Sequence, residues 1–165
     1  MSEPSSPPGQ GAIHNRLFDF EADFSGDLRC LPMAVRRKLD LAGVKLKLVH
    51  WHGLSSAERA TLLQWKDDKN SLGEMRAWLF TRTDNLPEGP AKPLQPLRSS
   101  AWQEAGPMPE EVALSCDQLG LKIEPQRWAN LDELQRFALI KLSHPGHEHR
   151  NLPTALLEFG LLKDS

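Results

Sequence analysis

The chain has 165 residues, of which 39% are apolar and 25% are charged. This composition can form one hydrophobic core, and it excludes collagen, a coiled coil and a wholly disordered chain. Twenty basic and 22 acidic side chains give a net charge of −2, which argues against a general affinity for nucleic acid or for an anionic membrane.

The amino-terminal residues 1–15 are rich in Pro, Ser, Gly and Gln, so we expect a disordered tail there. They lack the basic start and the apolar stretch of a secretion signal, and no run of the chain approaches the roughly 20 apolar residues of a membrane span. We therefore expect a cytoplasmic protein with a single helical domain over residues 16–165. Cys30 and Cys116 are too few for a disulfide framework or a four-thiolate metal site.

Residues 17–24 alternate apolar and acidic side chains, which predicts a short strand or an extended arm on the core. The period then becomes helical. Pro32 suits the start of a helix and Gly43 suits its end, so a helix is expected over Met33–Ala42 with an apolar stripe on one face.

Two further helices are expected in the first half, each after a segment with the form of a capping box. Ser55-Ser56-Ala57-Glu58 opens an apolar run that ends near Trp65. Ser71-Leu72-Gly73-Glu74 has the same form and is followed by a second apolar run.

A linker is expected over residues 84–109, because six prolines in this segment forbid a long helix. The second half then predicts three more helices. The first runs from Pro109 to Leu119, the second begins at Asn130-Leu131-Asp132-Glu133, and the third covers Asn151–Phe159.

The two halves align with each other at an offset of 77 residues, with eight identities over positions 32–63 and no gap. A fixed offset of this kind is typical of a repeated structural unit. The identical pairs are Pro32/Pro109, Val35/Val112, Gly43/Gly120, Lys45/Lys122, Trp51/Trp128, Leu54/Leu131, Arg59/Arg136 and Leu62/Leu139. We therefore predict an all-α fold in which six main helices form two pseudo-symmetric three-helix repeats, near 32–82 and 109–159, that share one core.

Three of the six histidines fall in the segment 143–151, where imidazole and carboxylate groups offer ligands for a divalent metal. A metalloprotease helix requires His-Glu-x-x-His, but the fourth residue after His147 is Asn151. Pro145-Gly146 and Pro153 leave no room for such a helix. We interpret the segment as a turn between helices and predict no metal or other cofactor. The polar site that this turn offers consists of His147, Glu148, Arg150 and Asn151.

His50-Trp51-His52 could also suggest a metal site, but the second half has Arg127-Trp128-Ala129 at the matching positions. Only the Trp persists, which favours a structural role in the core.

A basic stretch follows from the first predicted helix into its connector, with Asp40 as its one acidic residue. Such a run is usually the solvated face of a helix, and it could also contact an acidic partner protein. The residues of this candidate partner surface are Arg36, Arg37, Lys38, Lys45 and Lys47. The chain has no phosphate-binding glycine loop, no nucleophile elbow and no paired carboxylates, so no catalytic residue is assigned and an enzyme is the less favoured class.

Several segments together resemble the nitrate reductase associated protein family: residues 18–24, 28–36, 38–40 and 43–46 near the start, and 134–143, 146–148, 150–151 and 158–161 near the end. The resemblance implies a small bacterial protein that accompanies nitrate reductase, with no reaction or active-site residue to transfer. It leads us to expect an accessory or regulatory protein that binds another protein, either nitrate reductase or a maturation factor. The alternative is a small metal-dependent enzyme or a carrier of a metal or small ligand that uses residues 144–151.

Overall fold

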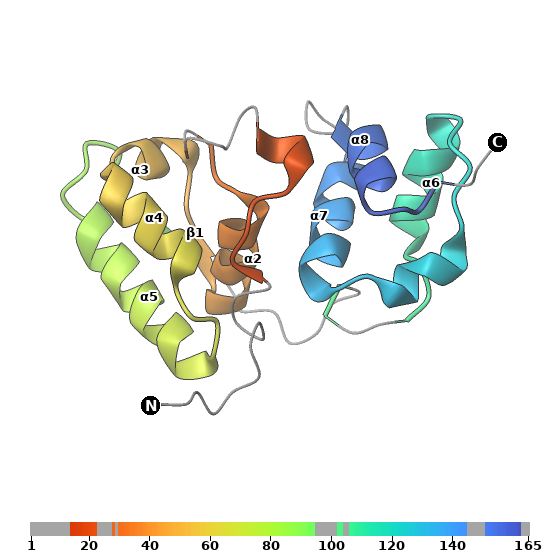
Figure 1. Ribbon diagram of the computed structural model, residues 1–165. Helices are drawn as coiled ribbons and strands as arrows, with labels where there is room; N and C mark the ends of the chain where they lie inside the picture. Colours follow the sequence, from red (N-terminus) through yellow and green to blue (C-terminus); the bar gives the residue numbers. More distant parts are fainter. Residues whose placement is uncertain are drawn as a thin grey trace. The chain divides into compact units, whose positions relative to one another are not determined.

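The computed structural model describes residues 14–22, 28, 30–94, 102–103, 106–144 and 151–162. These residues are mostly helical, with one small two-stranded sheet (Figure 1). The chain divides into two compact units, Met1–Arg98 and Ser99–Ser165, and each is described below by itself. The helical character is confirmed, the sheet was not expected, and the single domain over residues 16–165 remains a prediction. Residues 1–13 of the predicted tail lie outside the described residues.

The first unit begins with a short 3₁₀ helix, η2 (Asp19–Glu21), where an extended arm was predicted. The alternating pattern was therefore misleading over these residues. Glu21 is buried, and its carboxylate accepts hydrogen bonds from the backbone N–H of Phe18 at 3.0 Å and of Met33 at 3.1 Å. These two bonds explain the tight turn, because they satisfy the carboxylate and also cap the next helix. Residues 23 and 24 of the predicted arm lie outside the described residues.

Helix α2 (Met33–Ala42) has the predicted bounds. Pro32 is its N-cap, and Gly43 ends it in the left-handed conformation with φ 80°. Glycine reaches this conformation without the strain that a Cβ atom would add, which explains why the helix ends there.

Three further helices complete the first unit: α3 (Leu48–His52), α4 (Ser56–Gln64) and α5 (Lys69–Thr83). The capping box that begins α4 is confirmed, since Ser55 and Glu58 bind each other's backbone N–H groups. The predicted cap of α5 was wrong. Asp68 caps this helix by accepting from the N–H of Ser71 at 2.8 Å, so Ser71 lies inside the first turn.

Part of the predicted linker belongs to the first unit. Residues 84–94 follow α5 and end at β2 (Lys92–Pro93), which pairs antiparallel with β1 (Val44–Lys45). The N–H of Leu94 continues this pairing by donating to the carbonyl oxygen of Gly43 at 2.8 Å. The two strands are 47 residues or more apart along the chain, so no local pattern could predict their pairing.

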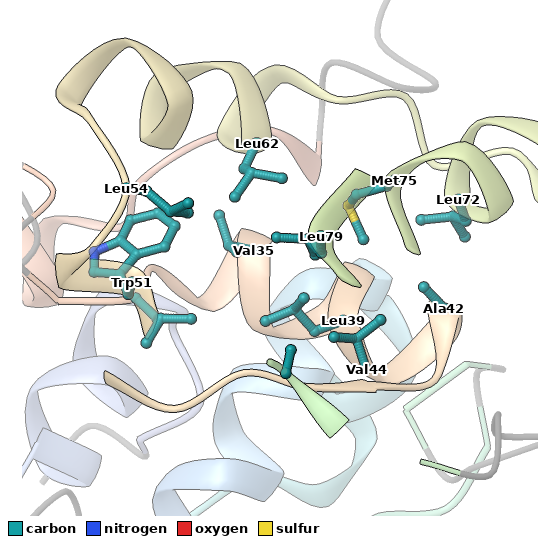
Figure 2. Packing of buried hydrophobic residues seen from close by; sticks show 12 residues of the cluster. Val35, Leu39, Ala42, Val44, Trp51, Leu54, Leu62, Leu72, Met75 and Leu79 are labelled. Atoms are coloured by element: carbon teal, nitrogen blue, oxygen red, sulfur yellow. The ribbon is translucent and has the colours of Figure 1, made fainter. Parts of the chain in front are cut away.

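The core of the first unit is formed by α2 and α5 together with the ends of α3 and α4. Figure 2 shows Val35 of α2 between the Trp51 ring and Leu79 of α5. Trp51 is fully buried, and its indole N–H donates to the carbonyl oxygen of Leu28 at 2.7 Å. The prediction that this Trp has a structural role is consistent with its position.

The second unit contains α6 (Glu110–Gln118), a 3₁₀ helix η3 (Pro125–Asn130), α7 (Glu133–Ser143) and α8 (Leu152–Glu158). Helix α7 contacts both α6 and α8. The predicted start of α7 is corrected by two residues, because Asp132 is its cap and Asn130 belongs to η3. The core surrounds Phe137. Its ring packs edge to face against the ring of Trp102, with the two ring centroids 5.1 Å apart.

The two units have the same helix caps and the same positive-φ glycines at matching positions. Pro32 and Pro109 are N-caps, Gly43 and Gly120 both have positive φ, and capping boxes begin α4 and α7. Other elements differ: α3 is matched by the 3₁₀ helix η3, and α5 is 15 residues long where α8 has seven. The repeat therefore remains a proposal, to which we return below.

Candidate functional site

The residues of the predicted basic surface do not share one environment. Arg37 and Lys38 are buried, with 5% and 0% of their surfaces exposed. Arg37 forms an ion pair with Asp67 at 3.0 Å, which joins α2 to the connector between α4 and α5. The interpretation of the entire run as a solvated face therefore does not fit these two residues, which support the core.

The buried amine of Lys38 has four oxygen neighbours. It donates to the carbonyl oxygens of Leu62 and Leu63 at 2.7 Å and of Trp65 at 2.9 Å, and it lies 3.0 Å from the side-chain oxygen of Asn15. Burial lowers the pKa of Lys38 to about 7, while the nearby Asp67 opposes this shift. The amine thus satisfies carbonyl groups that the end of α4 leaves without a helical partner.

Arg36, Lys45 and Lys47 retain access to solvent. Arg36 is half-buried on α2, whereas Lys45 and Lys47 are exposed. Along residues 44–47 the side chains alternate between the core and the solvent, because β1 and the residues after it are extended. Lys45 and Lys47 therefore share the outer face of this segment.

The structure adds Lys92, which the sequence analysis missed. Lys92 lies directly opposite Lys45 in the two-residue ladder of β1 and β2, and it is exposed. We define the lysine surface as Lys45, Lys47 and Lys92. None of its three ammonium groups has a hydrogen-bond or ion-pair partner among the described residues. Like charges directly opposite each other destabilise an antiparallel pair. A bound anion would reduce the repulsion between the lysines and so stabilise this surface.

Exposed apolar side chains follow the lysine surface along the chain. Leu48 and Val49 come directly after Lys47, and Leu94 comes two residues after Lys92. Their exposed fractions are 45%, 44% and 41%. Each of the three therefore lies within two residues of a lysine of this surface along the chain, and is accessible to a partner that binds there.

The predicted polar turn is only partly described. His147, Glu148 and Arg150 lie outside the described residues. Asn151 is the N-cap residue of α8, but its side chain makes no capping hydrogen bond.

The other histidine candidates are placed on α3. The Nδ1 atom of His50 accepts from the N–H of Lys47 at 3.0 Å, and its Nε2 atom lies 3.0 Å from the carbonyl oxygen of Gly89. His50 is thus buried in backbone contacts, whereas His52 is exposed. The described part of the chain contains no group of three or more His, Cys, Asp or Glu side chains placed to hold a metal ion.

Among the described residues, no helix combines the length and the apolar character needed to cross a bilayer. Comparison with curated proteins and with solved structures gives no significant match. Comparison with protein families matches residues 17–159 to the conserved nitrate reductase-associated proteins. Because this match covers most of the chain, the protein belongs to the conserved nitrate reductase-associated protein family.

Proposed function

We propose that this protein is an accessory or regulatory protein of bacterial nitrate assimilation, that it works in the cytoplasm, and that it acts by binding another protein. The partner is nitrate reductase itself or a factor that loads the cofactor of that enzyme. The family's association with nitrate reductase supports this proposal.

The structural observation that carries the proposal is the lysine surface. Lys45 and Lys92 lie opposite each other without a carboxylate partner among the described residues. An acidic partner surface would relieve their repulsion and would raise the rate of association by electrostatic attraction. The neighbouring Leu48, Val49 and Leu94 would supply apolar area to the same contact.

The test is affinity capture from nitrate-grown cells, in parallel with nitrate reductase activity in a deletion strain. The decisive variant reverses the lysine surface (Lys45→Glu, Lys47→Glu, Lys92→Glu). A matched control reverses three exposed lysines elsewhere (Lys66→Glu, Lys69→Glu, Lys122→Glu) and causes the same change in net charge. We expect nitrate reductase or its maturation factor to be captured by the wild type and by the control, and to be lost with the lysine-surface variant.

Enzyme activity gives the second measurement. Nitrate reductase activity is expected to fall in the deletion strain and to be restored by the wild type and the control, but not by the lysine-surface variant. Unchanged activity in the deletion strain, together with no captured nitrate reductase or maturation factor, would contradict the proposal. Equal capture by both variants would exclude the lysine surface as the docking site.

We also propose that residues 32–82 and 109–159 are two related three-helix repeats. The matching caps, the two positive-φ glycines and the two buried Trp residues support this. Arg59 and Arg136, also a matched pair, each bind backbone carbonyl groups through their guanidinium groups. In related sequences, the two halves are expected to share these positions when aligned at the same offset. Related sequences that keep the caps but lose the paired Trp and Arg positions would argue against duplication.

A further inference from the structure

A second surface lies on the second unit, which contains none of the residues of the lysine surface. An open groove of about 810 Å³ is lined by Ala113 and Leu114 of α6 and by Leu121 and Ile123 of the segment that follows this helix. Cys116 contributes to its lining, and burial raises the pKa of this thiol to about 11. The thiol is therefore neutral at physiological pH and adds to the apolar character of the groove.

Two carboxylates accompany this apolar lining. Glu110 and Asp117 lie seven residues apart on α6, and Ala113 and Leu114 lie between them. The positions i, i+3, i+4 and i+7 share one face of an α-helix, and seven residues correspond to about 10 Å along its axis. Along the face of α6 that lines the groove, two apolar side chains therefore lie between two negative charges.

These polar groups are available to a ligand. Neither Glu110 nor Asp117 has a hydrogen-bond or ion-pair partner among the described residues, and both are exposed. Leu114 has 52% of its surface exposed although it lies beside other apolar side chains. A ligand that covers Leu114 and brings cations to both carboxylates would satisfy all three groups.

We propose that this groove binds an amphipathic helix of a partner protein, in which apolar side chains are flanked on each side by Lys or Arg. A helix fits the spacing, because cations one turn before and one turn after a central apolar residue are about as far apart as Glu110 and Asp117. Binding of an apolar helix face in an open groove is a common mode of peptide recognition. The charge of this surface is opposite to that of the lysine surface, so the two would select different partners.

The test uses the full chain and a synthetic helical peptide of 14 residues, in which a central Leu-rich face is flanked by Lys. A second peptide of the same length has Glu in place of each Lys. We expect the Lys peptide to bind with a micromolar dissociation constant in 0.15 M salt, and to shift NMR amide signals mainly between residues 106 and 129. The Glu peptide is expected to bind at least tenfold more weakly, because it would face Glu110 and Asp117.

Variants separate this groove from general electrostatic attraction. Glu110→Gln with Asp117→Asn, and separately Leu114→Ala, are expected to weaken binding of the Lys peptide at least fivefold. Glu88→Gln with Glu111→Gln makes the same change in net charge, and Leu157→Ala removes a more exposed leucine on α8; both are expected to leave affinity within twofold.

Three outcomes would overturn the proposal: no binding of the Lys peptide, equal binding of both peptides, or equal losses in the groove variants and their controls. The lysine-surface variant is expected to bind the Lys peptide within threefold of the wild type. Failure of the proposed function and failure of this inference are therefore distinguishable.

Discussion

The amine of Lys38 lies 2.7 Å from the carbonyl oxygen of Leu62, so a buried cation on α2 satisfies the end of α4. The carbonyl ends of a helix attract positive charge, and two further carbonyl oxygens there accept from the same amine. This contact is opposed by the cost of removing an ammonium group from water. The balance between these effects depends on pH.

We predict that Lys38 makes the protein more stable as the pH rises from about 7 to about 9. The pKa of Lys38 is lowered to about 7 by burial, while an unfolded lysine keeps its ordinary value of 10.5. Between these values the unfolded state binds more protons than the folded state, so the free energy of unfolding increases with pH. Chemical denaturation at several pH values measures this slope, and Lys38→Met is expected to remove it.

The window for this measurement ends at about pH 9 because Cys116 acts in the opposite direction. Its pKa is raised to about 11 in the folded state, so the stability it contributes is lost as the pH rises from about 9 through 11. Lys66→Met, at an exposed lysine, is the control and should keep the wild-type slope. A slope that is unchanged in Lys38→Met would show that this amine does not titrate in the window.

We expect substitution of the two buried Trp residues to lower the free energy of unfolding by different amounts. The indole N–H of Trp51 donates to Leu28, whereas that of Trp128 has no acceptor among the described residues. Trp51→Phe loses a partly buried hydrogen bond and leaves the Leu28 oxygen with one donor fewer, so it should cost about 1 kcal/mol more than Trp128→Phe. Urea denaturation measures both, and equal or reversed losses would contradict the expectation.

We predict no stoichiometric metal in protein purified without a histidine tag. The reason is the sequence of the polar turn, in which Pro145-Gly146 and Pro153 exclude a helical frame around His147. Elemental analysis of the full chain is the measurement. About one zinc, copper or nickel ion per chain that is lost on His147→Ala would contradict this and would favour a metal enzyme or carrier.

Local patterns predicted the parts of the fold that local chemistry determines. Pro32 is the first cap of α2 and Gly43 the last, and the capping box of Ser55 and Glu58 begins α4. These caps could be predicted because each acts on backbone groups only a few residues away. Ser71 begins the same motif and was therefore predicted as a cap, but α5 already begins three residues earlier, where the carboxylate of Asp68 accepts from the N–H of Ser71. Two competing caps in one short segment cannot be ranked by pattern alone.

The candidate site was less predictable because it depends on distant contacts. Lys92 joins Lys45 through a pairing between segments far apart in the sequence. The burial of Lys38, in contrast, had a local signal: this residue follows Val35 by three positions and precedes Ala42 by four, so it lies on the apolar stripe of α2. The charge of Lys38 gives no sign of this burial, because most lysines in proteins are solvated.

Gly120 and Gly73 predict opposite effects of the same substitution. Gly120 has φ 71°, in the left-handed region, and a Cβ atom there would meet nothing within 4 Å, so the cost of Gly120→Ala comes from the backbone alone. We expect it to lower the free energy of unfolding by about 1–2 kcal/mol. Gly73 lies within α5 and also has open space around it, so Gly73→Ala should stabilise by about 0.5–1 kcal/mol, because alanine restricts the unfolded chain.

Gly43→Ala, at the matching position of the first unit with φ 80°, should lower the free energy of unfolding by at least as much as Gly120→Ala. Thermal and urea unfolding of the three variants measure these changes. A neutral Gly120→Ala would mean that the end of α6 can relax to negative φ, and the matched glycines would then no longer support a common origin of the two halves.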